Sequence, residues 1–61
     1  MLKSGDRFCI FSPAYLAGKF AVVLEEEVLG DGSKSGHWLV QFEHTDIVVA
    51  LFESQMLVLN L

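Results

Sequence analysis

Residues His37 to Glu43 form the longest clean alternation of large apolar and polar side chains in this sequence. One side of the alternation carries Trp38, Val40 and Phe42. Because successive side chains of a β-strand point to opposite faces, the pattern predicts a strand with one buried and one mostly solvated face. We expect this strand at the centre of an antiparallel meander whose core lies on the Trp38 face. Leu39 is the one apolar residue on the solvated face.

The chain has 61 residues, which predicts a single domain spanning residues 1–61. A domain of this size buries only about 60% of the surface that its unfolded chain exposes. Yet 52% of the residues are hydrophobic, which is more than so small a core can cover. Some apolar side chains should therefore lie at the surface, where a contiguous apolar patch usually marks an interface.

Four more strands are predicted from alternation or from β-branched content, over residues 7–11, 19–27, 47–52 and 56–59. The alternation breaks at 22–24, which indicates a bulge in the second strand. Pro13 should end the first strand, because proline cannot donate a ladder hydrogen bond. Residues 14–18 are too few for an independent helix and predict a short 3₁₀ turn, with Tyr15 and Leu16 folded over one end of the core. Residues 30–36 are all turn formers and predict a loop.

The segment Ile47–Phe52 has no polar residue at all. A strand buried on both faces gives such a run, but a sheet in 61 residues has no second layer to cover both faces. One face of this strand should therefore be exposed or covered by a partner. The exposed set is either Ile47, Val49 and Leu51 or Val48, Ala50 and Phe52.

These elements predict an all-β fold, a small five-stranded SH3-like barrel with a short 3₁₀ turn. Closure of the sheet would hide the edge strands that so apolar a sheet would otherwise offer to other copies. Glu25, Glu26 and Glu27 are expected to be a solvated strand end or, alternatively, an acidic docking edge for a basic partner.

The charge balance disfavours nucleic-acid binding. The sequence has eight acidic and four basic residues, which gives a net charge of −4, and the basic residues are scattered singly along the chain. Nucleic-acid binders normally present a basic face. No apolar run approaches the ~20 residues of a membrane span, and a single cysteine, Cys9, suits a reducing compartment. We therefore expect a cytoplasmic protein, with a peripheral position on a membrane complex as the alternative.

No catalytic, cofactor-binding or metal-binding residues are predicted. His37 and His44 flank one strand and should lie roughly 20 Å apart, at ~3.3 Å per residue, so they cannot share a metal within one chain. Cys9 has none of the spacings typical of zinc sites. A small barrel is filled by its own side chains, which leaves no pocket for a nucleophile and its base.

Four segments carry a resemblance to a known group of proteins. They are Gly5-x-x-Phe8-x-Ile10-x-x-Pro13-x-Tyr15, Lys19-Phe20-Ala21-Val22-Val23, Trp38-Leu39-Val40-Gln41-Phe42-Glu43 and Leu51-Phe52-Glu53-x-x-Met56. Their order resembles the small SH3-like barrels of photosynthetic electron transport. These include the photosystem I stromal subunit PsaE, the variable chain of ferredoxin-thioredoxin reductase, and small barrel subunits of cytochrome b6f and of the thylakoid NDH complex.

The resemblance implies an accessory or regulatory subunit without a cofactor of its own, at the stromal or cytoplasmic face of the thylakoid. Two departures stand out. Ala21 occupies the place where those proteins usually have the Gly of a Gly-Thr-Val strand, and the basic residues that PsaE-like subunits offer to ferredoxin have no clear equivalents here.

The predicted function is non-catalytic docking on a larger protein complex through an apolar sheet face. The candidate interaction residues are Leu39, Val49, Leu51 and Phe52, with Tyr15 and Phe11 at the rim. A homo-oligomer would satisfy the same apolar face with identical copies. The alternative is a nucleic-acid or ribosome-associated barrel of the KOW or Sm-like kind, which shares the strand pattern.

Overall fold

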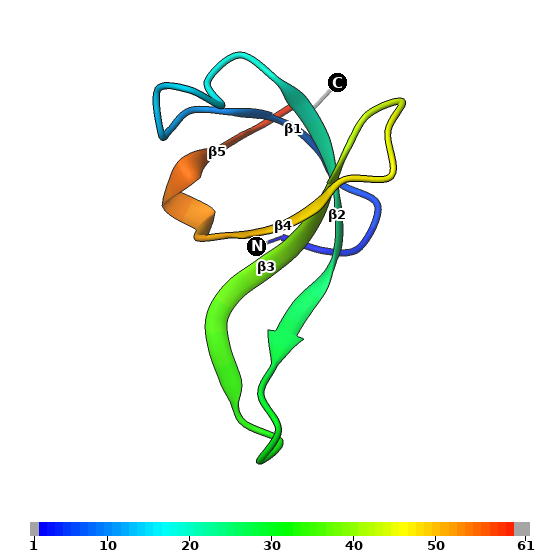
Figure 1. The fold of residues 1–61 in the computed structure, drawn as a ribbon, viewed down its shortest axis with the longest axis vertical. Coiled ribbons are helices and arrows are strands. Elements are labelled where there is room, and N and C mark those ends of the chain that lie inside the picture. Colours follow the sequence, from blue (N-terminus) through cyan, green and yellow to red (C-terminus); the bar gives the residue numbers. More distant parts are fainter. Residues whose placement is uncertain (1, 60–61) are drawn as a thin grey trace.

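A computed structural model describes residues 2–59, and these fold into five strands and one 3₁₀ helix (Figure 1). The elements are β1 (Arg7–Ile10), β2 (Phe20–Val28), β3 (Lys34–Phe42), β4 (Val48–Leu51), η1 (Glu53–Gln55) and β5 (Met56–Val58). All strands belong to one antiparallel sheet with the order β4-β3-β2-β1-β5. The predicted all-β class with five strands is confirmed.

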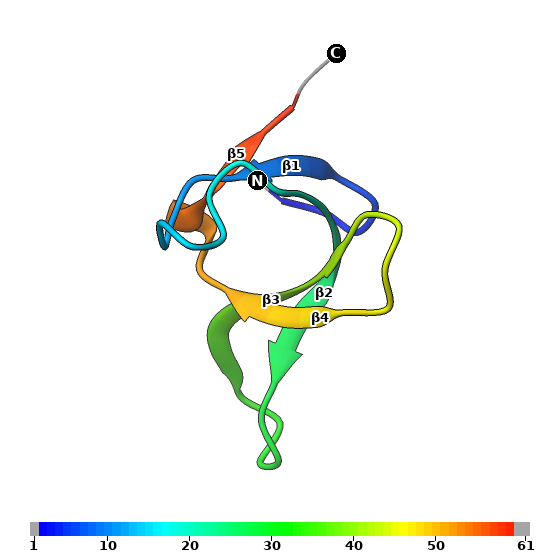
Figure 2. The same cartoon turned by 45° about the horizontal axis from the view of Figure 1, so that its top comes forward.

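The sheet is strongly curled but not closed. In Figure 2 the strands follow one another around a ring, and η1 spans the interval between β4 and β5. The edge strands β4 and β5 do not pair with each other, so the predicted closed barrel is not confirmed. The chain turns through η1 directly after β4. There Gln55 hydrogen-bonds the turn itself and the loop after β1, in place of a strand ladder.

The strands β2 and β3 form a long hairpin that projects beyond the rest of the sheet (Figure 1). Its turn is tight, with the Leu29 N–H donating to the Ser33 carbonyl at 2.7 Å, and pairing resumes at Val28 and Lys34. The predicted loop over 30–36 is therefore too long, since Lys34 to Gly36 already belong to β3. The predicted bulge is confirmed, because the register shifts between Val23 and Glu25.

The loop after β1 differs from its prediction. It consists of successive hydrogen-bonded turns, such as the Leu16 N–H donating to the Pro13 carbonyl at 2.9 Å, and the 3₁₀ helix lies instead at residues 53–55. Leu16 packs against the core as expected. Tyr15 does not, because 80% of its surface is exposed.

The core lies inside the curled sheet and draws on four strands and the segment before β1. Its buried members are Leu2, Phe8, Ile10, Ala21, Val23, Val40 and Leu51. Trp38 and Phe42 pack against this cluster beside Val40, which confirms the predicted inner face of β3. Val49 also packs against it, so β4 turns Val49 and Leu51 inward and Val48 and Ala50 outward.

Candidate docking surface

The outer surface of β3 and β4 carries three cross-strand rows of side chains. Val40 pairs with Val49 and Trp38 with Leu51 on the core side, so the residues between them point outward. Leu39 lies opposite Ala50, and Gln41 lies opposite Val48. The next row brings the His37 ring against Phe52, with ring centroids 4.0 Å apart. We call these six residues the outer β3–β4 face: His37, Leu39, Gln41, Val48, Ala50 and Phe52.

The outer β3–β4 face is largely apolar and carries no Asp, Glu, Lys or Arg. Val48 is 47% exposed and Phe52 is 48% exposed, while Leu39 is half-buried. The polar boundary lies beside His37, whose Nδ1 is 3.8 Å from Oε1 of Glu27. Glu25 lies opposite Leu39 on the β2 side. The arrangement is an uncharged apolar strip with acidic groups on one flank.

The structure divides the predicted interaction residues into three groups. Leu39 and Phe52 lie on the outer β3–β4 face. Leu51 is only 4% exposed, so the prediction that it lies at a docking surface is wrong, and Val49 is half-buried against the core on the same inner side of β4. The reason is the period of two along β4, which turns 49 and 51 to the same side as the core residue Val40.

Four residues of this face were not among the predicted interaction residues, namely His37, Gln41, Val48 and Ala50, although Val48 and Ala50 belonged to one of the two sets predicted for the exposed side of the strand. The signal was the uninterrupted run 47–52, which left either side of the strand as the exposed one. The register of the β3–β4 hairpin decides the choice, because Val49 lies opposite the inward-facing Val40.

Phe11 and Tyr15 belong to the loop between β1 and β2 and are 71% and 80% exposed. This loop is fastened to η1. The Phe11 N–H donates to the Gln55 carbonyl at 2.7 Å, and Gln55 Nε2 donates to the Ser12 carbonyl at 3.1 Å. The two aromatic residues are therefore a second exposed apolar element, anchored beside the turn that carries Phe52.

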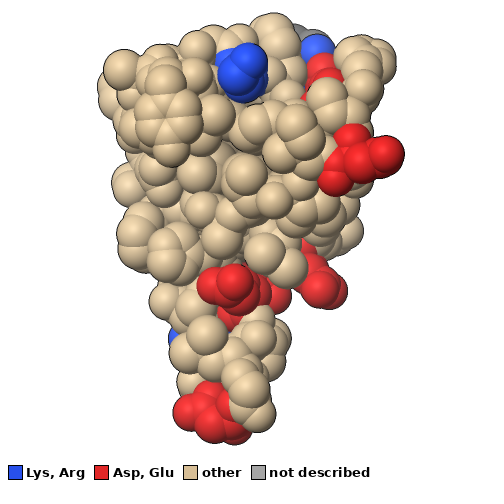
Figure 3. All heavy atoms as spheres, viewed as in Figure 1, with Lys and Arg blue, Asp and Glu red and all other residues tan. Residues whose placement is uncertain are grey.

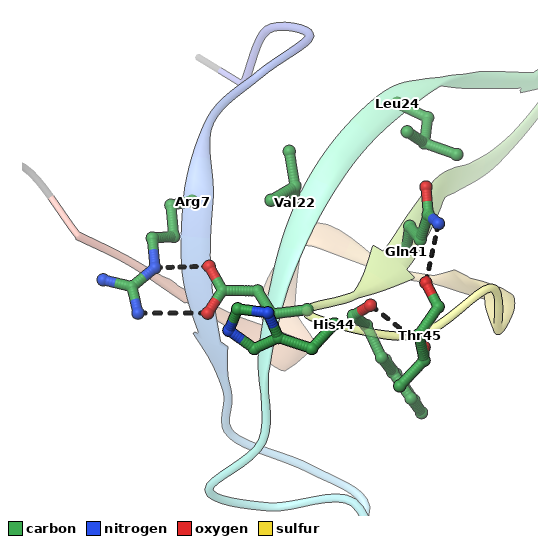
Figure 4. A pocket seen from close by; sticks show the side chains of 8 residues that line it. Arg7, Val22, Leu24, Gln41, His44 and Thr45 are labelled. Carbon is green, nitrogen blue, oxygen red and sulfur yellow. Dashed lines mark hydrogen bonds and ion pairs between the residues drawn. The ribbon is translucent and has the colours of Figure 1, made fainter.

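An open pocket lies where the start of β1 meets the turn after β3 (Figure 4). Arg7 and Glu43 form a two-point ion pair there, with Nη2 to Oε1 at 3.1 Å and Nε donating to Oε2. The Arg7 hydrogen bonds lower the pKa of Glu43, and Glu43 raises the pKa of Arg7. The guanidinium also lies 4.8 Å from the centre of the Phe20 ring.

The chemistry available in this pocket is limited. The charges of Arg7 and Glu43 are matched to each other, and the Thr45 hydroxyl donates to the Phe42 carbonyl at 3.0 Å. Gln41 Nε2 donates to the Thr45 carbonyl at 2.8 Å. His44 is the one titratable lining residue outside the ion pair, and its backbone is held in the left-handed region, with φ at 64°. The residues that line this pocket do not assemble a nucleophile with an oriented base.

Most basic side chains are already paired with carboxylates. Lys3 lies 3.4 Å from Asp6, Lys34 lies 3.1 Å from Glu26, and Arg7 pairs with Glu43. In the face shown in Figure 3, acidic atoms lie along one border and on the projecting hairpin, while uncharged side chains cover most of the body. Three of the four basic side chains are therefore paired with a nearby carboxylate.

Within the described part of the chain, no three His, Cys, Asp or Glu side chains come together in a way that could hold a metal ion. None of the helical segments described is long and apolar enough to cross a membrane. Comparisons with protein-family models, with curated proteins and with solved structures give no match to this chain.

Proposed function

We propose that this protein is a non-catalytic interaction subunit that docks on a larger protein complex through the outer β3–β4 face. The observation that carries the proposal is the uncharged strip made by Leu39, Val48, Ala50 and Phe52 on a protein with a net charge of −4. A contiguous exposed apolar surface on a small protein is typical of a protein interface. The centres of such interfaces are depleted in charged residues, as this strip is.

We further propose that the curled sheet is an SH3-like barrel. The strand order, the Pro13-containing loop after β1 and the 3₁₀ helix before β5 support this assignment. Segments such as Trp38–Glu43 resemble the small SH3-like barrels of photosynthetic electron transport. On that basis we propose the role of an accessory or regulatory subunit in photosynthetic electron transport. The paired states of Lys3, Arg7 and Lys34 favour a protein partner over nucleic acid.

The test is affinity capture from a native extract with a tagged chain and two matched variants. Val48→Asp places a carboxylate on the outer β3–β4 face, and Leu57→Asp places one on β5, at a side chain that is 61% exposed. We expect a defined set of proteins to bind the wild type and Leu57→Asp and to be lost with Val48→Asp. Equal capture by both variants would remove the outer β3–β4 face from the proposal.

A further inference from the structure

The edge of the sheet at β4 has unpaired backbone groups. The Phe42 N–H donates to the Ile47 carbonyl at 3.0 Å, which identifies 42 and 47 as a hydrogen-bonded pair of the antiparallel ladder. Because hydrogen-bonded and non-hydrogen-bonded pairs alternate, β4 bonds to β3 through Val49 and Leu51. The N–H and C=O groups of Val48 and Ala50 therefore point away from β3, toward the open side of the sheet.

The chain protects its two edges unequally. At Phe52 the N–H donates to Gln55 Oε1 at 2.8 Å and the carbonyl accepts from the Gln55 N–H at 2.9 Å, so this position is closed to a further strand. On β5 the Met56 N–H is bonded within the η1 turn, to the Glu53 carbonyl. The β4 segment 47–52 has no proline, no charge and no bulge, which are the usual protections of an exposed edge.

We propose that β4 pairs edge to edge with β4 of a second copy of this chain. The strands run antiparallel about a two-fold axis at Val49, so that Val48 of each copy lies opposite Ala50 of the other. Both residues have outward-pointing backbone groups, so this register forms four N–H to C=O hydrogen bonds. The result is a ten-stranded sheet across two copies, counting five strands in each, and the outer β3–β4 faces become one continuous apolar surface.

The self-complementarity of the β4 edge identifies the occupant as a second copy of the chain. An isologous contact needs the same patch on both sides, and the Val48–Ala50 segment satisfies this with one short strand. The segment has no charged side chain to meet its own copy, although each copy carries a net charge of −4. The nearest charges, Asp46 and Glu53, are both acidic. Repulsion between the copies should therefore weaken as salt rises, and association should increase.

The experiment combines molar mass with amide hydrogen exchange on the full chain. Sedimentation equilibrium from about 10 µM to 1 mM, the range suited to a small interface, should show a monomer–dimer equilibrium that salt shifts toward dimer. The amides of Val48 and Ala50 should become protected from hydrogen exchange as the fraction of dimer rises. A chain that stays monomeric throughout, or a dimer in which these two amides remain unprotected, would overturn the proposal.

Ala50→Pro is the deciding variant, because it removes an N–H that points to the open edge and none that bonds β3. Two of the four intermolecular hydrogen bonds are lost per dimer, so we expect dimerisation to weaken about tenfold or more. If this variant does not fold, Ala50→Lys charges the same exposed edge position in its place. Leu57→Lys is the matched control and should dimerise like the wild type.

The proposal does not depend on docking to a larger complex, and the two can fail separately. Leu39→Asp charges the outer β3–β4 face on β3, away from the open edge of β4, so it should lose partner capture and still dimerise like the wild type. Unchanged dimerisation of a folded Ala50→Pro overturns the edge pairing and leaves the proposed function standing. Dimerisation without capture of any protein does the reverse.

Discussion

The two sides of β4 differ in what they contact although they hardly differ in composition. Val49 and Leu51 face the core, where Leu51 is 4% exposed, while Val48 is 47% exposed on the opposite side and Ala50 is exposed beside it. Valine occurs on both sides, so hydrophobicity does not decide which residues are buried. The pairing of Val49 with Val40 decides it, because register determines which side of a strand meets the core.

The largest difference in stability between the two sides of β4 is expected at the adjacent residues Val48 and Val49. Val49→Asp should place an unpaired carboxylate against the core at a cost of several kcal/mol. Because small domains are stable by only about 5 kcal/mol or little more, this variant should be unfolded. Val48→Asp should stay folded. Far-UV circular dichroism with urea denaturation measures both, and loss of fold in both variants would contradict the outward assignment of Val48.

A milder contrast uses two leucines on the two edge strands. Leu51→Ala removes a buried side chain and should lower the free energy of unfolding by about 2–5 kcal/mol. Leu57→Ala, at a position that is 61% exposed, should change it by less than about 0.5 kcal/mol. Denaturant midpoints with equal slopes give both values. A similar loss of unfolding free energy in the two variants would contradict the assignment of Leu51 to the core around Phe8 and Val40 and of Leu57 to the surface.

A smaller effect is expected where β3 begins, beside Phe52. Gly36 has φ at 94°, and a methyl group added there would lie 3.8 Å from the Phe52 ring without a clash. Gly36→Ala should therefore cost about 1–2 kcal/mol through backbone strain alone. Gly30→Ala is the matched control, since no left-handed conformation or close neighbour opposes it. Thermal unfolding of the two variants should separate by several degrees.

The smallest effect concerns the exposed pair at Arg7 and Glu43. Arg7 lowers the folded-state pKa of Glu43 below its ordinary value of 4.5, so the pair's contribution is present above about that pH. It is lost as the pH falls through the folded-state pKa. Glu43→Gln should flatten this part of the stability curve between pH 3 and 6, as measured by urea denaturation. Asp6 and Asp31, whose pKa values are also lowered, should retain a remaining slope.

Much of the sheet was predictable because its signals are local. Alternation placed β3 and its inner face, the broken alternation at 22–24 placed the bulge in β2, and Pro13 marked the end of β1 within a few residues. Leu16 was correctly expected over the core. These features depend on residues adjacent in sequence, whose preferences are readable without the rest of the chain.

The rest depends on pairings between distant residues. The uniform run Ile47–Phe52 did not distinguish its two sides, so the candidate interaction residues included Val49 and Leu51, which lie on the core side. The extension of β3 to Lys34 was missed because Lys34 pairs with Val28 of β2 across a register shift, where Gly36 has a left-handed φ of 94°. The open sheet was missed because pairing between the two edge strands depends on residues in different parts of the chain, which local alternation does not report.

The position of β1 has a consequence for the order in which this fold assembles. β1 lies between β2, which follows it closely, and β5, whose pairing partner for Phe8 is Val58. The hairpins β2–β3 and β3–β4 close short loops, whereas the β1–β5 ladder closes a loop of almost the whole chain. Because loop closure costs more entropy for a longer loop, the β1–β5 ladder should form last. During synthesis β1 therefore waits with one side unpaired until residues 56–58 emerge. In that interval the nascent chain exposes a second unpaired strand edge besides that of β4. Such an edge can pair with other protein chains, so aggregation is most favoured at this stage.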